Sequence, residues 1–555
     1  MKPEELSEAI ATCVAAAVAA NQLPASAIDT PVQVERPKNR EHGDWATNIA
    51  MILAKPAQKP PRAVAEELVG HISKVPGVKS AAIAGPGFIN IFIDPAAAAE
   101  LALEIIANHE NYGKSNQLIG QQINIEFISA NPTGPLHLGH TRWAAVGDAI
   151  ARVLLAAGAE VTREFYINDR GVQMQKFAHS ILATIKSEPV PEDGYQGEYI
   201  AELGKQIIEL EPNLLQLKTD EQLSRVLKLG YALQLKQQQD SLKEFNTEFD
   251  VWYSELQMHE AGKVKHALNV LEKAGHVDHT DGAMWLRTTD FGDDKDRVLV
   301  KSDGEYTYFA SDCAYYIDKR ERGFGRCVYL LGADHHGYVN RLRAVAACAG
   351  DDPDKNIEVL IGQLVKIMKN GEEVKLSKRA GDLILLTDLV AAVGVDAVRY
   401  SLIRYPVDTP LVLDFDLMTS RTNDNPVYYV QYAHARINAL LNTASELGIN
   451  WATGNISFDP TQLGSPAEQE LIAQLAQFPA IVATSAELRE PHRIARYLEE
   501  LATGYHRFYD NCRVLPAAGA EVSSQTVARL HLCRATQIVI RNGLDLLGVA
   551  APERM

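Results

Sequence analysis

Residues 130–140 read Ala-Asn-Pro-Thr-Gly-Pro-Leu-His-Leu-Gly-His, and this stretch decides the fold of the centre of the chain. It follows an apolar, β-prone run over 123–128 and precedes an alanine-rich helical pattern over about 138–157. Pro132, Gly134 and Pro135 favour a turn between the two elements. The sequence therefore predicts a strand, a turn and a helix in succession, with two histidines at the start of the helix.

This arrangement is suited to binding a polyphosphate. A helix start presents free N–H groups and the positive end of the helix dipole. His137 and His140 lie three positions apart, so both rings can reach one phosphoryl group. Gly139 has no side chain and leaves room for a flat adenine against the backbone. By itself, however, the segment could equally be a helix cap with two incidental histidines.

A second motif lies far downstream, where residues 371–381 read Gly-Glu-Glu-Val-Lys-Leu-Ser-Lys-Arg-Ala-Gly. Lys375, Lys378 and Arg379 are clustered in a glycine-bounded loop after an apolar strand over 357–361. Such cations suit the β- and γ-phosphates of ATP, whose charge grows as they leave. A short basic segment alone is more typical of a solvated face, but its pairing with the histidine motif favours a nucleotide site.

The two motifs, in this order, resemble the signature motifs of class I aminoacyl-tRNA synthetases. Four further segments are similar to the arginyl-tRNA synthetase family: Glu-His-Gly-Asp-Trp-Ala-Thr-Asn at 41–48, Gly-Pro-Gly-Phe at 85–88, Glu-Phe-Ile-Ser-Ala-Asn at 126–131, and the closing sequence 546–555. Since these segments are spread over the whole chain, the resemblance extends from end to end.

The chain is expected to fold as an α/β protein of three parts. Residues 1–112 predict a small α+β domain, and 113–410 predict a doubly wound, Rossmann-like parallel sheet with strands near 123–128, 161–167, 327–331 and 357–361. A polar helical stretch over about 189–275 interrupts this pattern as an insertion. Residues 411–555 predict an all-α bundle with helices at 428–446, 465–485, 491–512 and 524–547. The resemblance implies that the first domain binds the tRNA elbow and the last binds the anticodon.

The composition indicates the cellular compartment of the protein and the kinds of site that it can contain. Its 555 residues are enough for several hydrophobic cores, and its six cysteines form no Cys-x-x-Cys pair. This favours a reducing compartment and argues against a structural zinc site. The apolar run Ala9–Ala20 is too short to cross a bilayer and follows acidic residues, so a cytoplasmic protein without a membrane anchor is expected. The net charge of −17 argues against a general nucleic-acid binder and requires that any RNA contact be local.

An arginine pocket needs carboxylates, because a guanidinium is planar and permanently charged. The resemblance places Glu126, Tyr308 and Asp312 at the guanidinium and Asn131 at the α-amino group, and Ser129 is a further candidate for arginine contact. Asp334 follows a strand and is expected at the same sheet edge, where it is a candidate for contact with the substrate. On residues alone, Glu126 could be a surface charge at a strand end, and Tyr308 and Asp312 could be a helix cap beside a core aromatic. The Asp-His-His at 334–336 could also suggest a metal phosphoesterase, but further acidic ligands are not evident nearby.

The resemblance also implies the ATP site and its chemistry. His137, His140, Lys375 and Lys378 are the expected catalytic residues, and the ATP-binding set comprises these four with Pro132, Gly134, Gly139, Ser377 and Arg379. Mg²⁺ is expected to arrive with ATP, without a dedicated protein metal site. Arginine would attack ATP to give arginyl-adenylate, and the 2′-hydroxyl of the terminal adenosine of tRNA(Arg) would then accept the arginyl group.

Five residues are candidates for contact with tRNA. Tyr429, Tyr432 and Tyr509 resemble the family's base-stacking aromatics, and Phe88 and Asn90 hold a similar place for the tRNA elbow. Each tyrosine could instead be an ordinary core residue. Gly85 stands where the family can have Asn, which weakens the case for a base-specific contact there.

The function predicted from the sequence is therefore that of a monomeric arginine–tRNA ligase. One alternative is another nucleotidyltransferase of the same fold that adenylates a small acid, although such an enzyme has no need of a long helical C-terminal domain. A second is a catalytically silent, synthetase-like RNA-binding protein, although both histidines and both lysines are retained.

Overall fold

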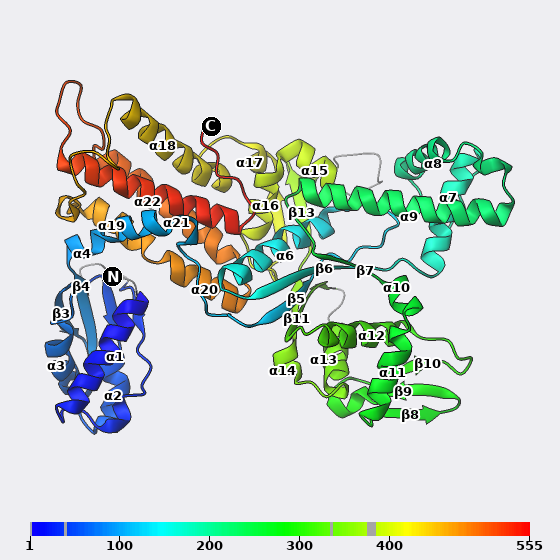
Figure 1. The fold of residues 1–555 in the computed structure, drawn as a ribbon, viewed down its shortest axis with the longest axis horizontal. Helices are drawn as coiled ribbons and strands as arrows, with labels where there is room; N and C mark the ends of the chain where they lie inside the picture. Colours follow the sequence, from blue (N-terminus) through cyan, green and yellow to red (C-terminus); the bar gives the residue numbers. More distant parts are fainter. Residues whose placement is uncertain (1–2, 38–41, 334–336, 375–383) are drawn as a thin grey trace.

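The computed structural model describes residues 3–37, 42–333, 337–374 and 384–555, and it has three parts (Figure 1). An N-terminal unit lies below one end of a helical bundle in this view. A central parallel sheet adjoins the other end of the bundle. Two further regions lie on the side of the sheet away from the bundle. A group of long helices is at the upper right of Figure 1, and a small α/β region is at the lower right.

The central sheet has five strands in the order β12-β11-β5-β6-β7, and all pairs are parallel. The strands are β5 (Gln122–Glu126), β6 (Glu160–Ile167), β7 (Val251–Ser254), β11 (Arg326–Gly332) and β12 (Ile357–Gly362). The chain adds β6 and β7 on one side of β5 and later adds β11 and β12 on the other. The sheet therefore reverses its direction of growth beside β5, which is where doubly wound sheets bind ligands. This confirms the predicted fold class.

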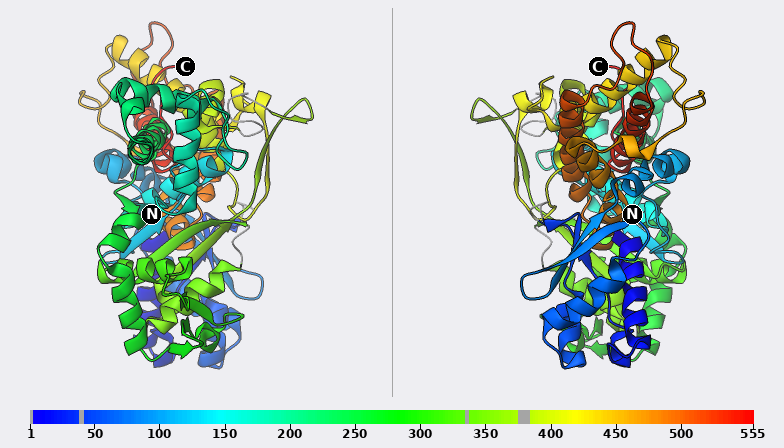
Figure 2. Two further views of the ribbon diagram at one scale, coloured as in Figure 1. Left: turned by 90° about the vertical axis from the view of Figure 1, so that its right-hand side faces the viewer. Right: turned by 90° about the vertical axis from the view of Figure 1, so that its left-hand side faces the viewer.

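Two strands lie where helices were expected. The helical interval 189–275 does contain α8 (Glu198–Leu210) and α9 (Thr219–Glu244), but it also contains β7, the edge strand of the sheet. In the region after 408, β15 (Leu411–Asp414) pairs in parallel with β13 (Val365–Lys369). The β13–β14 hairpin, completed by β14 (Glu372–Glu373), projects from the body (Figure 2). Both missed strands are four residues long, too short to give a clear alternation of polar and apolar positions.

The N-terminal unit packs three helices against an antiparallel sheet of order β1-β2-β4-β3. The helices are α1 (Pro3–Ala19), α2 (Ile49–Ala57) and α3 (Pro61–Ile72), and the strands are β1 (Val34–Glu35), β2 (Trp45–Thr47), β3 (Val78–Ala84) and β4 (Phe88–Ile93). The last buried residue of its hydrophobic core is Ile93. The following α4 (Pro95–Ala99) and α5 (Leu101–Asn108) pack instead with the bundle, so the expected boundary at 112 lies beyond the end of this core.

The C-terminal bundle consists of α18 (Pro426–Glu446), α19 (Pro466–Leu475), α20 (Phe478–Leu488), α21 (His492–Asn511) and α22 (Ser524–Leu546). The single helix expected over 465–485 is therefore wrong: it is two helices, and Pro479 lies in the first turn of the second. Pro479 has no N–H to donate to the carbonyl of Leu475, so the helical hydrogen-bond pattern is interrupted there and the first helix ends at Leu475.

A buried arginine joins the bundle to the central domain. Arg399, on α16 (Val395–Ile403), has no exposed surface. Its guanidinium donates to Asp148 Oδ2 at 2.6 Å on α6 (Leu138–Ala156) and to the Leu547 carbonyl at 3.1 Å after α22. It also donates to the Phe245 and Asn246 carbonyls at 3.0 Å after α9. One side chain thus ties together four segments that are distant in sequence.

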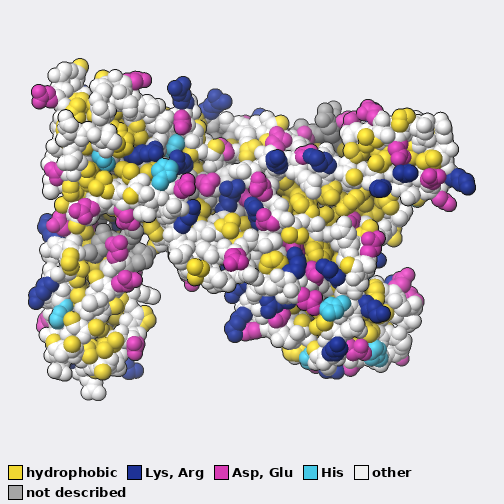
Figure 3. All heavy atoms as spheres, in the orientation of Figure 1, with side chains coloured by type: hydrophobic (Ala, Val, Ile, Leu, Met, Phe, Trp, Pro, Cys, Tyr) yellow, Lys and Arg dark blue, Asp and Glu magenta, His cyan; other side chains and the backbone are white. Residues whose placement is uncertain are grey.

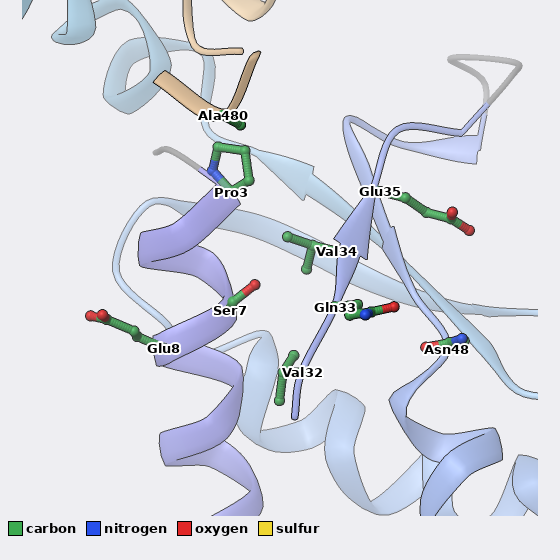
Figure 4. A pocket seen from close by; sticks show the side chains of 9 residues that line it. All are labelled: Pro3, Ser7, Glu8, Val32, Gln33, Val34, Glu35, Asn48 and Ala480. Atoms are coloured by element: carbon green, nitrogen blue, oxygen red, sulfur yellow. The ribbon is translucent and has the colours of Figure 1, made fainter. Parts of the chain in front are cut away.

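A cavity of about 570 Å³ opens where the N-terminal unit meets α20 (Figure 4). Its walls come from α1, the segment around β1, Asn48 and Ala480. None of the residues that the sequence predicts for substrate binding lines this cavity.

We expect Arg399→Met to lower the free energy of unfolding by about 3–5 kcal/mol, because it leaves the buried Asp148 carboxylate and three carbonyls short of a donor. Urea unfolding followed by tryptophan fluorescence measures the loss. Arg493→Met is the matched control, since Arg493 pairs with Glu490 on the surface and such pairs are worth at most about 1 kcal/mol. Equal effects of the two substitutions would contradict a central role for Arg399.

Candidate functional site

The two histidines form the start of α6. His137 is the N-cap, and its Nδ1 accepts the Gly139 N–H at 3.2 Å. His140 Nδ1 in turn accepts the His137 N–H at 3.3 Å, and the two ring centroids are 3.8 Å apart. The predicted pair is thus brought together at the carboxyl end of β5.

Burial and these contacts together determine which nitrogen of each ring carries a proton. Burial lowers the pKa of His137, and burial together with His137 lowers the pKa of His140 to about 3. Both imidazoles are therefore neutral near pH 7. Because each Nδ1 accepts a backbone N–H, the proton of each ring is on Nε2. The pair offers two neutral N–H donors side by side.

The turn between β5 and α6 is strained. Ile128 and Ser129 have φ values of 71° and 46°, a left-handed conformation that is rare for a β-branched residue. The Ser129 hydroxyl donates to Glu126 Oε1 at 3.0 Å and accepts the Tyr166 N–H at 3.2 Å, which holds the turn in place. Strain of this kind persists where the surroundings over-determine it, as they do at many active sites.

Contacts from the long helices fix the rest of the turn. Gln238 on α9 donates to the carbonyls of Asn131 and Gly134 at 3.0 and 2.8 Å, and Tyr199 on α8 donates to the Thr133 carbonyl at 3.0 Å. Pro132 is buried. A Cβ on Gly139 would lie 3.2 Å from His137 Cε1, so the glycine also makes room for the histidine ring.

The basic residues of the second motif lie outside the described residues: Lys375, Ser377, Lys378 and Arg379 fall within 375–383, and Asp334 is also outside. Description resumes at Ile384, and residues 384–386 pair with the histidine segment. Leu138 N donates to the Ile384 carbonyl at 2.8 Å, and Leu386 N donates to the Leu136 carbonyl at 2.9 Å. His137 and Leu385 thereby form a β-bridge. The chain that leaves the basic motif is hydrogen-bonded to the first turn of α6.

Carboxylates gather beside the end of β5. Glu126 is half-buried and pairs with Lys319 Nζ at 2.6 Å, and Lys319 itself is fully buried between the rings of Tyr315 and Tyr329. Asp312, on α12 (Tyr308–Glu321), accepts a hydrogen bond from Tyr338. Its pKa is raised to about 7, chiefly by burial and further by nearby carboxylates that include Glu255 and Glu126.

Glu255 is a site residue that the sequence reasoning missed. It starts α10 (Glu255–Glu260) directly after β7, and its side chain is 3% exposed. Burial raises its pKa, although it accepts hydrogen bonds from Tyr166 and Ser311. The sequence does not indicate Glu255 because β7 lies in the interval that was expected to be helical. Had the strand been recognised, an acidic residue at its carboxyl end would have pointed to the site.

Tyr308 and Asn131, two further predicted arginine contacts, both lie beside residues 171–173. Tyr308, in the first turn of α12, is 73% exposed, and a Cβ on Gly171 would lie 3.9 Å from its hydroxyl. Asn131 Nδ2 donates to Gln173 Oε1 at 2.7 Å.

Glu255 lies 3.7 Å from Arg170, and Glu126 is paired with Lys319. The pKa values of Glu255 and Asp312 are nevertheless raised, so the group of buried carboxylates suits a positively charged ligand.

A separate aromatic group lies on the bundle. Tyr429 and Tyr432 on α18 and Tyr509 on α21 come together around His506, whose ring centroid is 5.0 Å from that of Tyr429 and 5.7 Å from that of Tyr432. Arg436 lies 3.8 Å above the Tyr509 ring. His506 and Arg436 were not predicted. All five side chains are half-buried, so part of each ring or guanidinium is accessible to a ligand.

Phe88 and Asn90 lie on a different part of the molecule. Both are on β4 of the N-terminal sheet, two residues apart, so they share the face of the strand that is not fully buried. Gly85, at the turn before them, has φ of 51° and open space where a Cβ would be. The structure thus keeps the two predicted RNA-contacting groups on separate domains.

The chain is similar over its whole length to a set of known proteins. It matches three family descriptions: "Arginyl tRNA synthetase N terminal domain" over 4–93, "tRNA synthetases class I (R), catalytic domain" over 102–203 and 213–399, and "DALR anticodon binding domain" over 430–555. It is 54% identical over 557 residues to an "Arginine--tRNA ligase" of Renibacterium salmoninarum and 52% identical to one of Kineococcus radiotolerans, covering 100% of both chains in each case.

Solved structures agree. A putative arginyl-tRNA synthetase from Campylobacter jejuni superposes with a TM-score of 0.76 at 31% identity, covering 83% of this chain and 100% of that one. The arginyl-tRNA synthetase of Thermus thermophilus has the same fold, with a TM-score of 0.76 at 24% identity over 100% of both chains.

The raised pKa of Asp312 generates a prediction about pH. If a guanidinium binds the ionised carboxylate, a pKa of about 7 in the free protein means that protons compete with the ligand below pH 7. The dissociation constant for L-arginine should then rise about 30-fold from pH 8 to pH 5.5, as expected for one titrating group. Isothermal titration calorimetry at several pH values measures it.

Asp312→Asn is the control for this prediction. The amide cannot ionise, so the variant should bind arginine more weakly at pH 8 and lose most of the pH dependence. A variant that keeps the wild-type pH profile would show that another group is responsible.

Proposed function

The chain belongs to the arginyl-tRNA synthetase family, and we propose that it is an arginine–tRNA ligase that acts in two steps. In the first, a carboxylate oxygen of L-arginine attacks the α-phosphorus of ATP, the bond to the β-phosphate oxygen breaks, and arginyl-adenylate and pyrophosphate form. In the second, the 2′-hydroxyl of the terminal adenosine of tRNA(Arg) attacks the arginyl carbonyl, loses its proton, and displaces AMP. The pairing of the segment after the basic motif with the histidine turn, beside an acidic pocket, is the observation that carries this proposal.

The acidic pocket is the proposed arginine site. Asp312 and Glu126 would receive the guanidinium, with Glu255 close by. Tyr308, Ser129, Asn131 and Asp334 would complete the contacts, with Asn131 at the α-amino group. Lys319 already neutralises one oxygen of Glu126, so the charge of the bound guanidinium would be met mainly by Asp312. The planar fork of a guanidinium can bond two carboxylates at once, whereas the point charge of lysine cannot match that geometry.

The histidine pair is the proposed centre of phosphate chemistry. The two Nε2–H groups would donate to the α-phosphoryl oxygens as charge develops in the transition state. Because the backbone already orients both rings, this stabilisation requires little reorganisation. Neither ring has to exchange a proton. Lys375 and Lys378, assisted by Arg379 and Ser377, are proposed to hold the leaving pyrophosphate. Pro132, Gly134 and Gly139 would shape the adenosine side.

Mg²⁺ is proposed to enter as the complex with ATP, because phosphate oxygens are its usual ligands. Within the described residues, no group of three or more His, Cys, Asp or Glu side chains is placed to hold a metal ion. When bound, Mg²⁺ would neutralise charge on the leaving phosphates.

The tRNA is proposed to contact two domains. Tyr429, Tyr432 and Tyr509, with His506 and Arg436, would stack on anticodon bases, and Phe88 and Asn90 would contact the tRNA elbow. We take 1–112, 113–410 and 411–555 as the corresponding functional units. We further propose that the protein acts as a cytoplasmic monomer. One segment, 466–488, is long and apolar enough for a membrane span, but it is divided between α19 and α20 and packs within the bundle.

The activity is tested by charging unfractionated tRNA with radiolabelled arginine, lysine or glutamine in the presence of ATP and Mg²⁺. We expect charging with arginine and background incorporation of the other two, because only a guanidinium fits the carboxylate pair. Preferential charging with lysine or glutamine would overturn the proposed function.

Tyr432→Ala tests the aromatic group. Loss of one stacking partner should raise the KM for tRNA about 5- to 150-fold, since stacking is worth roughly 1–3 kcal/mol per base, and it should leave the affinities for arginine and ATP unchanged. Tyr505→Ala, at a neighbouring tyrosine without exposed surface, is the control for a core role and should instead cost about 3–5 kcal/mol of stability. A Tyr432 variant that melts as early as the Tyr505 variant and binds tRNA normally would assign Tyr432 to the core.

A further inference from the structure

Two arginines on α22 meet at one histidine from another part of the chain. Arg534 and Arg541 are seven residues apart, so they lie on the same face of the helix. Arg541 lies 2.9 Å from His109 Nε2 and 3.2 Å from its Nδ1, both measured from one terminal nitrogen of the guanidinium. Arg534 lies 3.4 Å from His109 Nε2. Figure 3 shows basic and histidine side chains gathered over α22 on the face toward the viewer.

His109 is held firmly in this position. It follows α5 with φ of 47° and ψ of −117°, an unusual conformation for a residue other than glycine. Asn542 Nδ2 donates to the His109 carbonyl at 2.8 Å and to the Tyr112 carbonyl at 3.1 Å. Burial, then Arg541 and Arg534, lower the pKa of His109, so the ring is neutral and does not compensate either guanidinium.

The two guanidiniums lack negative partners in the described part of the chain. Arg534 donates to the neutral Gln537 Oε1, and its pKa is lowered by burial and by Arg541, without an opposing carboxylate. Two exposed carboxylates, Glu110 and Asp545, line the nearby cavity, but neither forms an ion pair with Arg534 or Arg541 in the described part of the chain. Glu110 acts on His109, and Asp545 lies 3.7 Å from Arg152 and is 79% exposed. Half-buried like charges that share one neutral partner are unfavourable unless an anion joins them.

A cavity of about 370 Å³ opens beside these groups. It lies between the segment that follows α5, the end of α6, α20 and α22, and His109, Arg541, Asn542 and Lys114 are in its walls. Lys114 is exposed, and its Nζ, now 3.0 Å from Asn111 Oδ1, is free to turn toward an anion. The cavity therefore has the guanidinium of Arg541 and the exposed ammonium of Lys114 in its walls. The guanidinium of Arg534 contacts the same His109 ring.

We propose that this cavity binds a phosphate oxyanion, with Arg541 as the bidentate donor, Lys114 as the second cation and Arg534 supporting through charge. Guanidinium forks match the spacing of phosphate oxygens, and the half-buried setting strengthens the attraction. The phosphate is either a backbone phosphodiester of bound tRNA or a free phosphate. Only the first source depends on the proposed function, because binding of a free phosphate requires no ligase activity.

The direct test uses the full-length protein and inorganic phosphate, with binding measured by equilibrium dialysis against the same ionic strength of chloride. Wild type should bind phosphate, and Arg541→Gln should weaken binding on the order of 10- to 100-fold, as expected for loss of a charge-assisted hydrogen bond. Lys114→Gln, at an exposed position that should not affect folding, should weaken it less. Arg225→Gln is the control, since Arg225 on α9 pairs with Glu211 after α8 and is remote in sequence from this cavity.

The second measurement is tRNA binding across a salt series. If the phosphate belongs to tRNA, Arg541→Gln and Lys114→Gln should each reduce the slope of log K against log salt by about 1, and Arg225→Gln should not. Weakened phosphate binding with an unchanged tRNA slope assigns the cavity to a free phosphate. If neither variant changes phosphate or tRNA binding relative to the control, the proposal is overturned.

Discussion

The position of the C-terminal bundle on the central domain depends on the guanidinium of Arg399. A guanidinium carries five N–H donors in a rigid plane, and here they are taken up by a buried aspartate and by carbonyls from the ends of α9 and α22. Asp148, the aspartate, is on α6, the same helix whose first turn carries the two histidines. The contact therefore fixes the position of the bundle relative to the two histidines, although Arg399 is not among the residues proposed to contact a substrate.

A second buried arginine reinforces the same helix. Arg142, one residue after the first turn of α6, donates to the Gln363 carbonyl at 2.6 Å and to the Pro406 and Thr409 carbonyls at 3.0 and 3.1 Å. These acceptors lie at the end of β12 and in the segment before β15. Arg142 thus holds α6 near its beginning, and the contact between Asp148 and Arg399 holds it at its middle. These contacts stabilise the strained turn at Ile128 and Ser129.

The sequence predicts the features that arise from neighbouring residues. The order of strand, turn and helix around 123–157, and the meeting of His137 with His140, follow from local periodicity and from proline and glycine positions. It does not reveal contacts between distant segments. The pairing of Glu126 with Lys319 spans 193 positions, Glu255 follows a strand too short to recognise, and the acceptors of Arg399 come from three other regions. The roles of Lys375 and Lys378 rest on the motif alone, since both lie outside the described residues.

The reach of Arg399 has a consequence for the order in which a nascent chain can fold. The Leu547 carbonyl that it bonds is 148 positions later in the sequence, and at 5–20 residues per second a ribosome needs roughly 7–30 s to make that stretch. During this interval α6 and α16 can pair through Asp148, but part of the guanidinium remains without an acceptor. The junction between the central domain and the C-terminal bundle is thus completed only after α22 has been made. A chain interrupted before that point has an incomplete core that chaperones and proteases can recognise.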